Sequence, residues 1–212
     1  TYTKETIETL ANLFGPPDKV QMISAVHLRP EPQYWFSHAG SFSEKESQVL
    51  EALRYAPRPF ILYVTKQQDC VKWEKILKNN GYIRIARFDG KTSDIDRKGI
   101  IDEWIENKLD GVVATSAFGV GIDKGNVRTV IHATIPETLD RYYQEVGRGG
   151  RDGMPSVSLV IYENSDWDIC RKMANPTLIS NELGIKRWES LYQSRKVVAE
   201  DASLFELDLG VI

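Results

Sequence analysis

The sequence is poor in cysteine, with only Cys70 and Cys170 among its 212 residues, and these two lie far apart. Isolated thiols provide neither a disulfide framework nor the Cys-x-x-Cys pairs of a zinc site. We therefore expect no bound metal and a reducing environment, the cytoplasm. Apolar runs long enough to cross a bilayer are also missing, as is a signal peptide. These absences predict a soluble protein without a membrane partner.

A large excess of charge of either sign is missing too. The chain has 27 basic and 30 acidic residues, for a net charge of −3. A nearly neutral chain does not attract nucleic acid through its overall field, so any such contact must come from a local patch. The histidines are scattered at His27, His38 and His132, and their spacing indicates neither a metal site nor a catalytic pair. The sequence also has no acidic pair at the end of an apolar strand that would hold a magnesium ion.

What the sequence does contain is a regular alternation of short apolar runs and helical patterns. Continuous apolar runs are typical of strands that are buried on both faces. Strands and helices that alternate at this pitch predict an α/β fold, in which a parallel sheet has helices on both faces. The expected strands are Phe60–Val64, Tyr82–Phe88, Val112–Thr115, Val127–Ile135 and Val157–Tyr162.

The alternation ends after Tyr162, and this change suggests a domain boundary. We place the α/β domain at residues 1–163, including a lead-in helix at its start. Residues 164–212 are expected to form a helical extension or the start of a following domain. The chain begins at Thr1 rather than at Met, so we expect it to be a piece of a longer protein.

The loops that follow the predicted strands are the candidate ligand sites. Ligands of parallel sheets bind beyond the carboxyl ends of the strands. The loops at Thr65, Gly90 and Thr115, together with the glycine-rich stretch after Val146, should therefore lie at or near one rim.

The loop Gly90-Lys91-Thr92 resembles the end of a phosphate-binding P-loop. Ile85 occupies the position of that motif's first glycine, so the loop cannot curl around a phosphate in the same way. It still places a lysine and backbone N–H groups at the start of a helix. Such a loop can contact the phosphates of a nucleic-acid backbone.

A helical stretch with two arginines at its end is the most informative segment. Leu139, Tyr142, Tyr143 and Val146 are spaced as one apolar stripe, and glycines follow. Arg148 and Arg151 lie one turn apart, and Gln144 lies one turn before Arg148. Paired guanidinium groups among glycines are suited to a phosphate ligand. The alternative is an ordinary helix end with two solvated arginines.

A second informative segment follows the strand that ends near Thr115. Thr115 and Ser116 offer hydroxyl groups, Gly119 and Gly121 leave room for a ligand, and Asp123 offers a carboxylate. By itself this segment is also compatible with an ordinary glycine-containing turn.

Together, the two segments resemble a known family. Ala-Thr-Ser-Ala-Phe-Gly-Val-Gly-Ile-Asp-Lys and Tyr-Tyr-Gln-Glu-Val-Gly-Arg-Gly-Gly-Arg-Asp-Gly resemble motifs V and VI of superfamily 2 helicases, most closely those of the RecQ family. Residues 61–65 resemble motif IV in position and character. The resemblance implies the second of two RecA-like lobes. It also implies that ATP binds between the lobes, with Mg²⁺ held by a first lobe outside this sequence.

The resemblance also implies roles for individual residues. Arg148 and Arg151 match the arginine fingers, while Gln144, Gly121 and Asp123 match positions that face ATP or the contact between the lobes. The implied partners are single-stranded or duplex DNA, the first lobe of the same chain, and further domains or proteins. The residues expected to hold the nucleic-acid backbone are Thr65, Lys66, Gly90, Lys91, Thr92, Thr115 and Ser116.

The sequence departs from the RecQ pattern in three places. The four-cysteine zinc module that often follows this lobe is absent or altered, because Cys170 is the only cysteine in that region. Asp123 stands where RecQ proteins often have asparagine, and Gly149 stands where the family has alanine. A non-catalytic lobe that binds nucleic acid or protein, a motor that acts on RNA, and a translocase that does not unwind DNA are therefore alternatives.

Overall fold

The computed structural model describes residues 4–15, 29–119, 122–174, 180–193, 195–197 and 205–206. Contacts between residues divide the chain into two compact units, Thr1–Ala174 and Asn175–Ile212. The expected lead-in helix is present as α1, Lys4–Phe14. No helix within the described ranges is long and apolar enough to cross a membrane.

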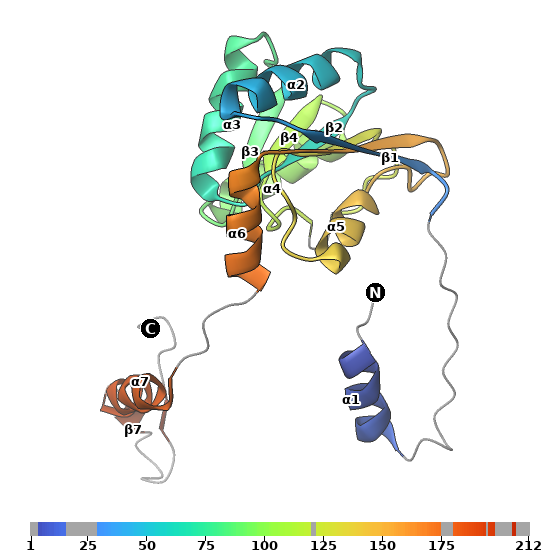
Figure 1. Ribbon diagram of the computed structural model, residues 1–212. Helices are drawn as coiled ribbons and strands as arrows, with labels where there is room; N and C mark the ends of the chain where they lie inside the picture. The colour runs from blue at the N-terminus through green and yellow to red at the C-terminus, as the bar shows by residue number, and fades with distance from the viewer. Residues whose placement is uncertain are drawn as a thin grey trace. The chain divides into compact units, whose positions relative to one another are not determined.

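The first unit contains a six-stranded sheet in the order β1-β6-β5-β2-β4-β3 (Figure 1). Every neighbouring pair of these strands is parallel, which confirms the predicted sheet. The strands β2, β4 and β5 are buried at every residue, as their continuous apolar runs predicted. The strands are β1 (Pro32–His38), β2 (Phe60–Tyr63), β3 (Ile85–Phe88), β4 (Gly111–Ala114), β5 (Thr129–His132) and β6 (Ser156–Tyr162).

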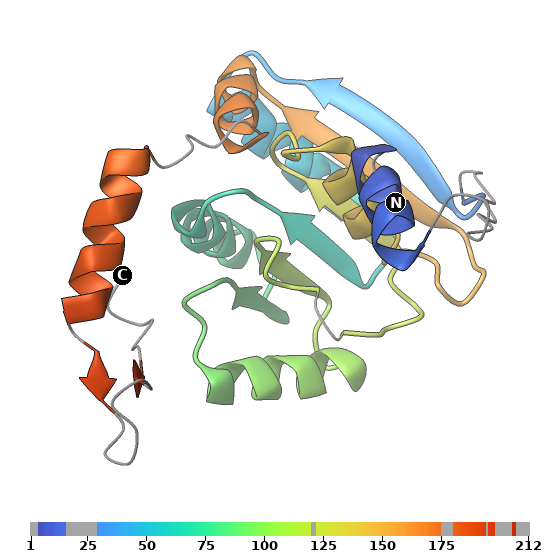
Figure 2. The ribbon, with the colours of Figure 1, turned by 90° about the horizontal axis from the view of Figure 1, so that it is seen from below.

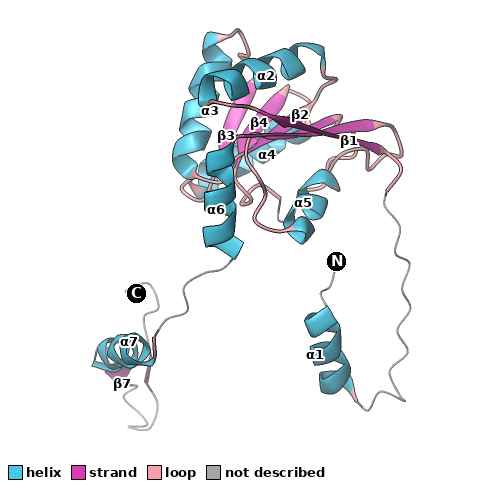
Figure 3. Ribbon diagram, viewed as in Figure 1, coloured by secondary structure: helices cyan, strands magenta, loops and turns pink. Residues whose placement is uncertain are grey.

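Helices cover both faces of this sheet (Figure 3). Successive residues of a strand point to opposite faces, so Phe60 and Leu62 pack under one helix pair while Ile61 and Tyr63 face the other side. On the first face, α2 (Phe42–Tyr55) and α3 (Gln67–Asn79) supply Val49, Leu53, Trp73 and Leu77. On the second face lie α4 (Asp94–Ile105) and α5 (Leu139–Val146).

The starts of three helices agree with local sequence signals. Ser41, Ser93 and Thr138 each accept a hydrogen bond through the side-chain oxygen from a backbone N–H in the first turn of α2, α4 and α5. Such caps satisfy donors that have no partner inside the helix. They therefore set the residue at which each of these helices begins.

The apolar stripe predicted for α5 is partly wrong. Leu139 is 79% exposed, whereas Tyr142, Glu145 and Val146 are buried. Glu145 can occupy the buried side because its Oε2 atom lies 2.9 Å from Nε2 of His132 on β5. Tyr142 and Val146 of the predicted stripe are thus buried, and the polar Glu145 shares their side of the helix in place of Leu139.

The helix α6, Asn164–Ala174, belongs to the first unit. Lys45 of α2 is 3% exposed and its Nζ lies 2.6 Å from Oδ2 of Asp166 and 2.9 Å from Oε1 of Glu163. The predicted boundary after residue 163 and the division after Ala174 thus differ by this one helix. This charge cluster joins α6 to α2.

The second unit contains α7, Asn181–Gln193, and a short antiparallel pair, β7 (Lys196–Val197) and β8 (Phe205–Glu206). A helix was expected here at residues 183–195. The rings of Trp188 and Tyr192 are stacked one turn apart, with centroids 6.4 Å apart. Both of these side chains are exposed within the described part of the unit.

Candidate functional site

The carboxyl edge of the sheet brings together three of the predicted loops. Thr65 follows β2, Gly90 lies just after β3, and Thr115 follows β4. The N–H of Thr115 donates to the carbonyl of Phe88 at 3.2 Å, and the hydroxyls of Thr65 and Thr134 lie 3.0 Å apart. Ser116 is exposed next to them, whereas Thr115 is 7% exposed. The prediction of a shared rim is correct for these loops.

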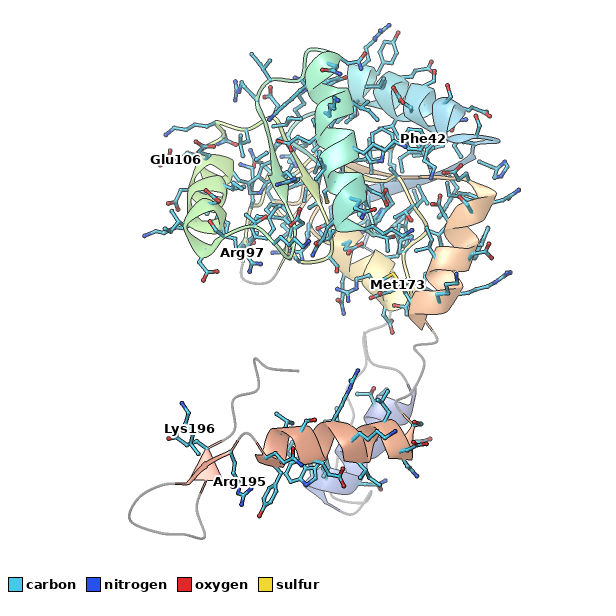
Figure 4. The ribbon with its side chains drawn as sticks, turned by 90° about the vertical axis from the view of Figure 1, so that its left-hand side faces the viewer. Phe42, Arg97, Glu106, Met173, Arg195 and Lys196 are labelled. Carbon is cyan, nitrogen blue, oxygen red and sulfur yellow. The ribbon has the colours of Figure 1, made fainter. Side chains whose placement is uncertain are left out.

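The Gly90-Lys91-Thr92 loop is held by its own hydrogen bonds. The N–H of Asp89 donates to the Thr92 hydroxyl at 2.9 Å, and the N–H of Lys91 donates to Oδ1 of Asp89 at 2.8 Å. Arg97, at the start of α4 (Figure 4), donates to the carbonyls of Thr92 and Gly90 at 2.8 and 3.2 Å. Lys91 itself is exposed, whereas Thr92 is half-buried.

The Lys91 side chain lines a surface groove between α3 and β3. Lys66 and Arg87 line the same groove, so three cationic side chains gather in a chain that is slightly acidic overall. The other lining residues are Gln67, Gln68, Val71 and the buried Asp89, whose Oδ2 lies 3.5 Å from Nε of Arg87. Local positive charge and side-chain amide donors can bind the phosphates of a nucleic-acid backbone. Such contacts do not distinguish one base from another. Arg87, Gln67 and Gln68 were not predicted, because their proximity to Lys91 depends on strand pairing.

A neighbouring hollow at the same edge is lined by Thr65, Ser116 and Thr134, and by buried polar side chains. His132 stacks on Tyr63 with ring centroids 5.3 Å apart, and it pairs with Glu145. Nδ1 of His132 is buried without a hydrogen-bond partner in the described structure. The remaining lining residues are Val64, Pro136, Glu137, Arg141 and Met173, and Met173 lies at the end of α6 (Figure 4).

The glycine-rich stretch after Val146 does not share this rim, so that expectation is wrong. The N–H of Gly150 donates to the carbonyl of Val127 just before β5, and the N–H of Ser156 donates to Glu31 at the start of β1, both at 2.9 Å. These contacts belong to the amino edge of the sheet. A helix that connects parallel strands runs back against them, and its carboxyl end therefore lies at the opposite edge (Figure 2).

Arg148 and Arg151 do lie on one side, as their spacing predicted. Both line a small pocket with Ile61, Trp104, Phe118, Ile122, Lys124 and Val127. Nη1 of Arg148 donates to the carbonyl of Gly119 at 2.8 Å, while Nη1 of Arg151 donates to Oδ1 of Asp123 at 2.8 Å. Nε of Arg148 is buried and has no hydrogen-bond partner in the described residues. The arginines are therefore not simply solvated at a helix end.

Gly119 makes this arrangement of Arg148 possible. A Cβ atom at Gly119 would lie 1.9 Å from Nη2 of Arg148, so any side chain there would displace the guanidinium group. The sequence predicted that this glycine leaves room for a ligand. The structure shows that it accommodates the arginine.

Tyr63 lies between the two regions. Its hydroxyl donates to the carbonyl of Phe118 at 3.0 Å, and its ring also lines the hollow at the carboxyl edge. Burial raises the pKa of Tyr63, and the positive charge of Arg148 opposes that rise. One buried ring thus connects the segment that holds Arg148 to the edge that carries Thr65.

The other predicted residues are less constrained. Gln144 is exposed on α5, and the Asp123 side chain is 85% exposed with Arg151 as its partner. Gly121 lies outside the described residues. Within the described ranges, no group of three or more His, Cys, Asp or Glu side chains is placed to hold a metal ion.

Comparison with known proteins defines the class of this α/β lobe. The helicase conserved C-terminal domain matches residues 44–153, which is more than half of the chain. The chain therefore belongs to this family.

More specific relatives are DNA helicases of the RecQ group. The chain is 40% identical over 106 residues to ATP-dependent DNA helicase RecQ of Bacillus subtilis, a match that covers 50% of this chain and 18% of that protein. It is 32% identical over 177 residues to ATP-dependent DNA helicase Q-like 5 of Arabidopsis thaliana, covering 82% of this chain and 19% of that protein. The lobe is thus the C-terminal lobe of a superfamily 2 helicase close to RecQ. The chain spans about a fifth of the length of these relatives.

Solved structures of DEAD-box proteins share the fold. The Escherichia coli DEAD-box protein SrmB, solved bound to regulator of ribonuclease activity A, aligns with a TM-score of 0.61 at 21% identity, covering 73% of this chain and 95% of that chain. The yeast DEAD-box splicing factor Prp28 aligns with a TM-score of 0.63 at 18% identity, covering 95% of this chain and 45% of that chain. These likenesses support the RecA-like architecture.

Proposed function

We propose that this chain is the second motor lobe of an ATP-dependent DNA helicase or translocase. ATP would lie between this lobe and a first lobe that holds Mg²⁺. The observation that carries the proposal is Arg148: its Nε is buried without a partner, in a helicase-family lobe, beside a glycine that leaves room for its guanidinium group. A cation with unused donors suits a phosphate ligand.

Bound ATP supplies the phosphoryl group that is transferred to water. Arg148 and Arg151 would place positive charge where the charge on that group spreads. Asp123 would hold Arg151 in position through their 2.8 Å ion pair, and the exposed Gln144 would face the nucleotide or the first lobe. This lobe alone should not hydrolyse ATP, because no P-loop is present in its sequence.

The carboxyl edge would hold the backbone of a single strand. Lys66 and Lys91 provide charge in the groove between α3 and β3, and Thr65, Ser116 and Thr134 provide polar groups in the adjacent hollow. The Gly90–Thr92 loop and the nearly buried Thr115 would support these contacts. Tyr63 bonds the carbonyl of Phe118, next to the residue that Arg148 contacts, and it also lines the hollow at the carboxyl edge. Movement of Arg148 toward a nucleotide would therefore change the position of groups at this edge.

The function is tested with the full-length protein on labelled DNA and RNA duplexes. We expect ATP hydrolysis that is stimulated by single-stranded DNA, together with ATP-dependent separation of the DNA strands. Stimulation by RNA alone would instead identify an RNA motor, and stimulation without strand separation would identify a translocase. A full-length protein that does not hydrolyse ATP would indicate a non-catalytic binding lobe.

Strand binding is tested by removing two lysines of the groove together. We expect Lys66→Ala with Lys91→Ala to weaken single-stranded DNA binding to a similar degree for every sequence. If each lysine neutralises one phosphate, the slope of log K against log salt should fall by about 1.4, at about 0.7 per contact. Fluorescence anisotropy with labelled oligonucleotides at several salt concentrations measures this slope.

The control is the double replacement Lys78→Ala with Lys108→Ala. These exposed lysines lie at the end of α3 and just before β4, at the amino edge of the sheet. The control removes the same net charge from the opposite edge, so it should leave the slope nearly unchanged. Equal losses in both double variants would show that the groove is not the binding site.

A further inference from the structure

Arg29 makes an unusual set of contacts with the turn that carries the two arginines. Its Nη1 donates to the carbonyl of Gly147 and its Nη2 to the carbonyl of Gly150, both at 2.9 Å. Its backbone N–H donates to the hydroxyl of Tyr143 at 3.0 Å. One residue thus binds three successive parts of the segment, although more than a hundred positions separate it from them in the chain.

The Arg29 side chain is itself held in place. Oε2 of Glu31 accepts from its Nε at 3.1 Å, and the Arg29 side chain is 29% exposed. The planar guanidinium group presents its donors in a rigid fork, so the two carbonyls are held at a defined separation. A lysine at this position would offer a single, less directed ammonium group in place of two separately placed nitrogens.

The Gly147–Gly150 turn is closely packed against Glu31, Met154 and Ser156. Gly150 has a φ of +63°, and a Cβ atom there would lie 2.5 Å from the Met154 carbonyl and 2.9 Å from Cβ of Glu31. At Gly149, an added Cβ would lie 2.8 Å from Oγ of Ser156. The turn therefore has no side chains of its own at these two positions, and it is held by backbone hydrogen bonds such as Gly150 N–H to the Val127 carbonyl and by the bonds that Arg29 donates to its carbonyls.

We propose that Arg29 is a positioning residue that holds the Gly147–Gly150 turn so that Arg148 and Arg151 project together. This proposal rests on the proposed function of those two arginines. Arg29 precedes residues 44–153, the part matched by the family, and it lies outside the two motif segments. It binds both ends of the interval that contains Arg148, and Gly147 also accepts from Nε of Arg151 at 3.2 Å. A small displacement of groups that stabilise a reaction lowers its rate strongly.

The experiment compares Arg29→Ala and Arg29→Lys in the full-length protein. The amide hydrogen-exchange rate of the peptide that covers residues 147–153 measures local opening of the turn. It does so independently of any role of Arg148 and Arg151 in catalysis. We expect faster exchange there in Arg29→Ala, and a fall in kcat for ATP of at least about tenfold with a smaller change in KM. Arg29→Lys should be intermediate in both measurements, and it also serves if the alanine variant folds poorly.

A double variant separates positioning from general destabilisation. If Arg29 acts through both arginines, then adding Arg29→Ala to Arg148→Ala should lower kcat by a smaller factor than Arg29→Ala does in the wild-type protein. Arg84→Ala is the matched control, because Arg84 donates to the carbonyls of Asn107 and Lys108 at 2.6 and 2.8 Å in a turn without either arginine. It should leave exchange at residues 147–153 and kcat unchanged.

Three results would overturn the proposal: unchanged exchange at residues 147–153 in Arg29→Ala, a kcat within twofold of the wild type, or fully additive losses in the double variant. Failure of the proposed function has a different signature. In that case Arg148→Ala itself would leave turnover intact, while Arg29→Ala would still speed up exchange in the turn.

Discussion

Replacing Arg148 with alanine should reduce ATP turnover of the full-length protein by about 10³–10⁵-fold, the usual contribution of an arginine finger. Arg151→Ala should reduce turnover in the same direction. The fold should survive, because Arg148 follows the end of α5 and is not a member of the hydrophobic core clusters. Steady-state ATP hydrolysis with saturating single-stranded DNA measures the loss, and near-ultraviolet circular dichroism checks the fold.

Gly119→Ala offers an independent approach to the same group. The added Cβ would lie 1.9 Å from Nη2 of Arg148, and the far end of a flexible side chain can move away at little cost to stability. We therefore expect a folded protein with displaced Arg148 and reduced turnover. Arg58→Ala is the control, since it removes an exposed arginine that pairs with Asp110. Near-normal turnover in both Arg148→Ala and Arg151→Ala would exclude the finger assignment.

Replacing Lys45 with methionine should destabilise the first unit by about 3–5 kcal/mol, the usual cost of removing one partner of a buried ion pair. The Lys45 side chain is 3% exposed, and it donates to Asp166, to Glu163 and to the carbonyl of Ala133. Methionine has a similar volume, so the main effect is the uncompensated charge of Asp166, whose side chain is 7% exposed. Urea unfolding followed by tryptophan fluorescence measures the change.

Lys78→Met is the matched control for Lys45. Lys78 is 51% exposed and pairs with Glu74 one turn away at 2.8 Å. An exposed pair of this kind contributes roughly 0–1 kcal/mol, because solvent screens it. If Lys45→Met cost no more than Lys78→Met, the charge cluster would not be what attaches α6 to the first unit.

The spacing of Lys45 within α2 contains a signal of its burial. Lys45, Val49 and Leu53 are spaced four residues apart in α2, and all three are buried. A lysine in the apolar stripe of a helix either extends its ammonium group to solvent or pairs it with a buried acidic group. The sequence cannot tell which, because Asp166 is 121 residues away and meets Lys45 only when α6 packs beside α2.

The placement of the glycine-rich turn shows a similar limit. The spacing of Arg148 and Arg151 predicted that they lie on one side, and both do line one pocket. The edge of the sheet at which they lie was predicted incorrectly, because the turn follows a helix and only the loops that follow strands lie at the carboxyl edge. The direction of α5 relative to the strands decides this, and Gly150 consequently contacts Val127 at the amino edge.

The sequence by itself determined the parallel sheet, the helices on its two faces and the shared side of the two arginines, because each depends on periodicity within a short segment. The motifs also identified the helicase family, which the comparison confirms. Only the tertiary structure decided that Arg29 binds the arginine-bearing turn, that Lys45 holds α6, and that the groove at Lys91 includes Arg87. These contacts join residues far apart in the chain, and local preferences carry no information about which distant groups meet once the elements pack.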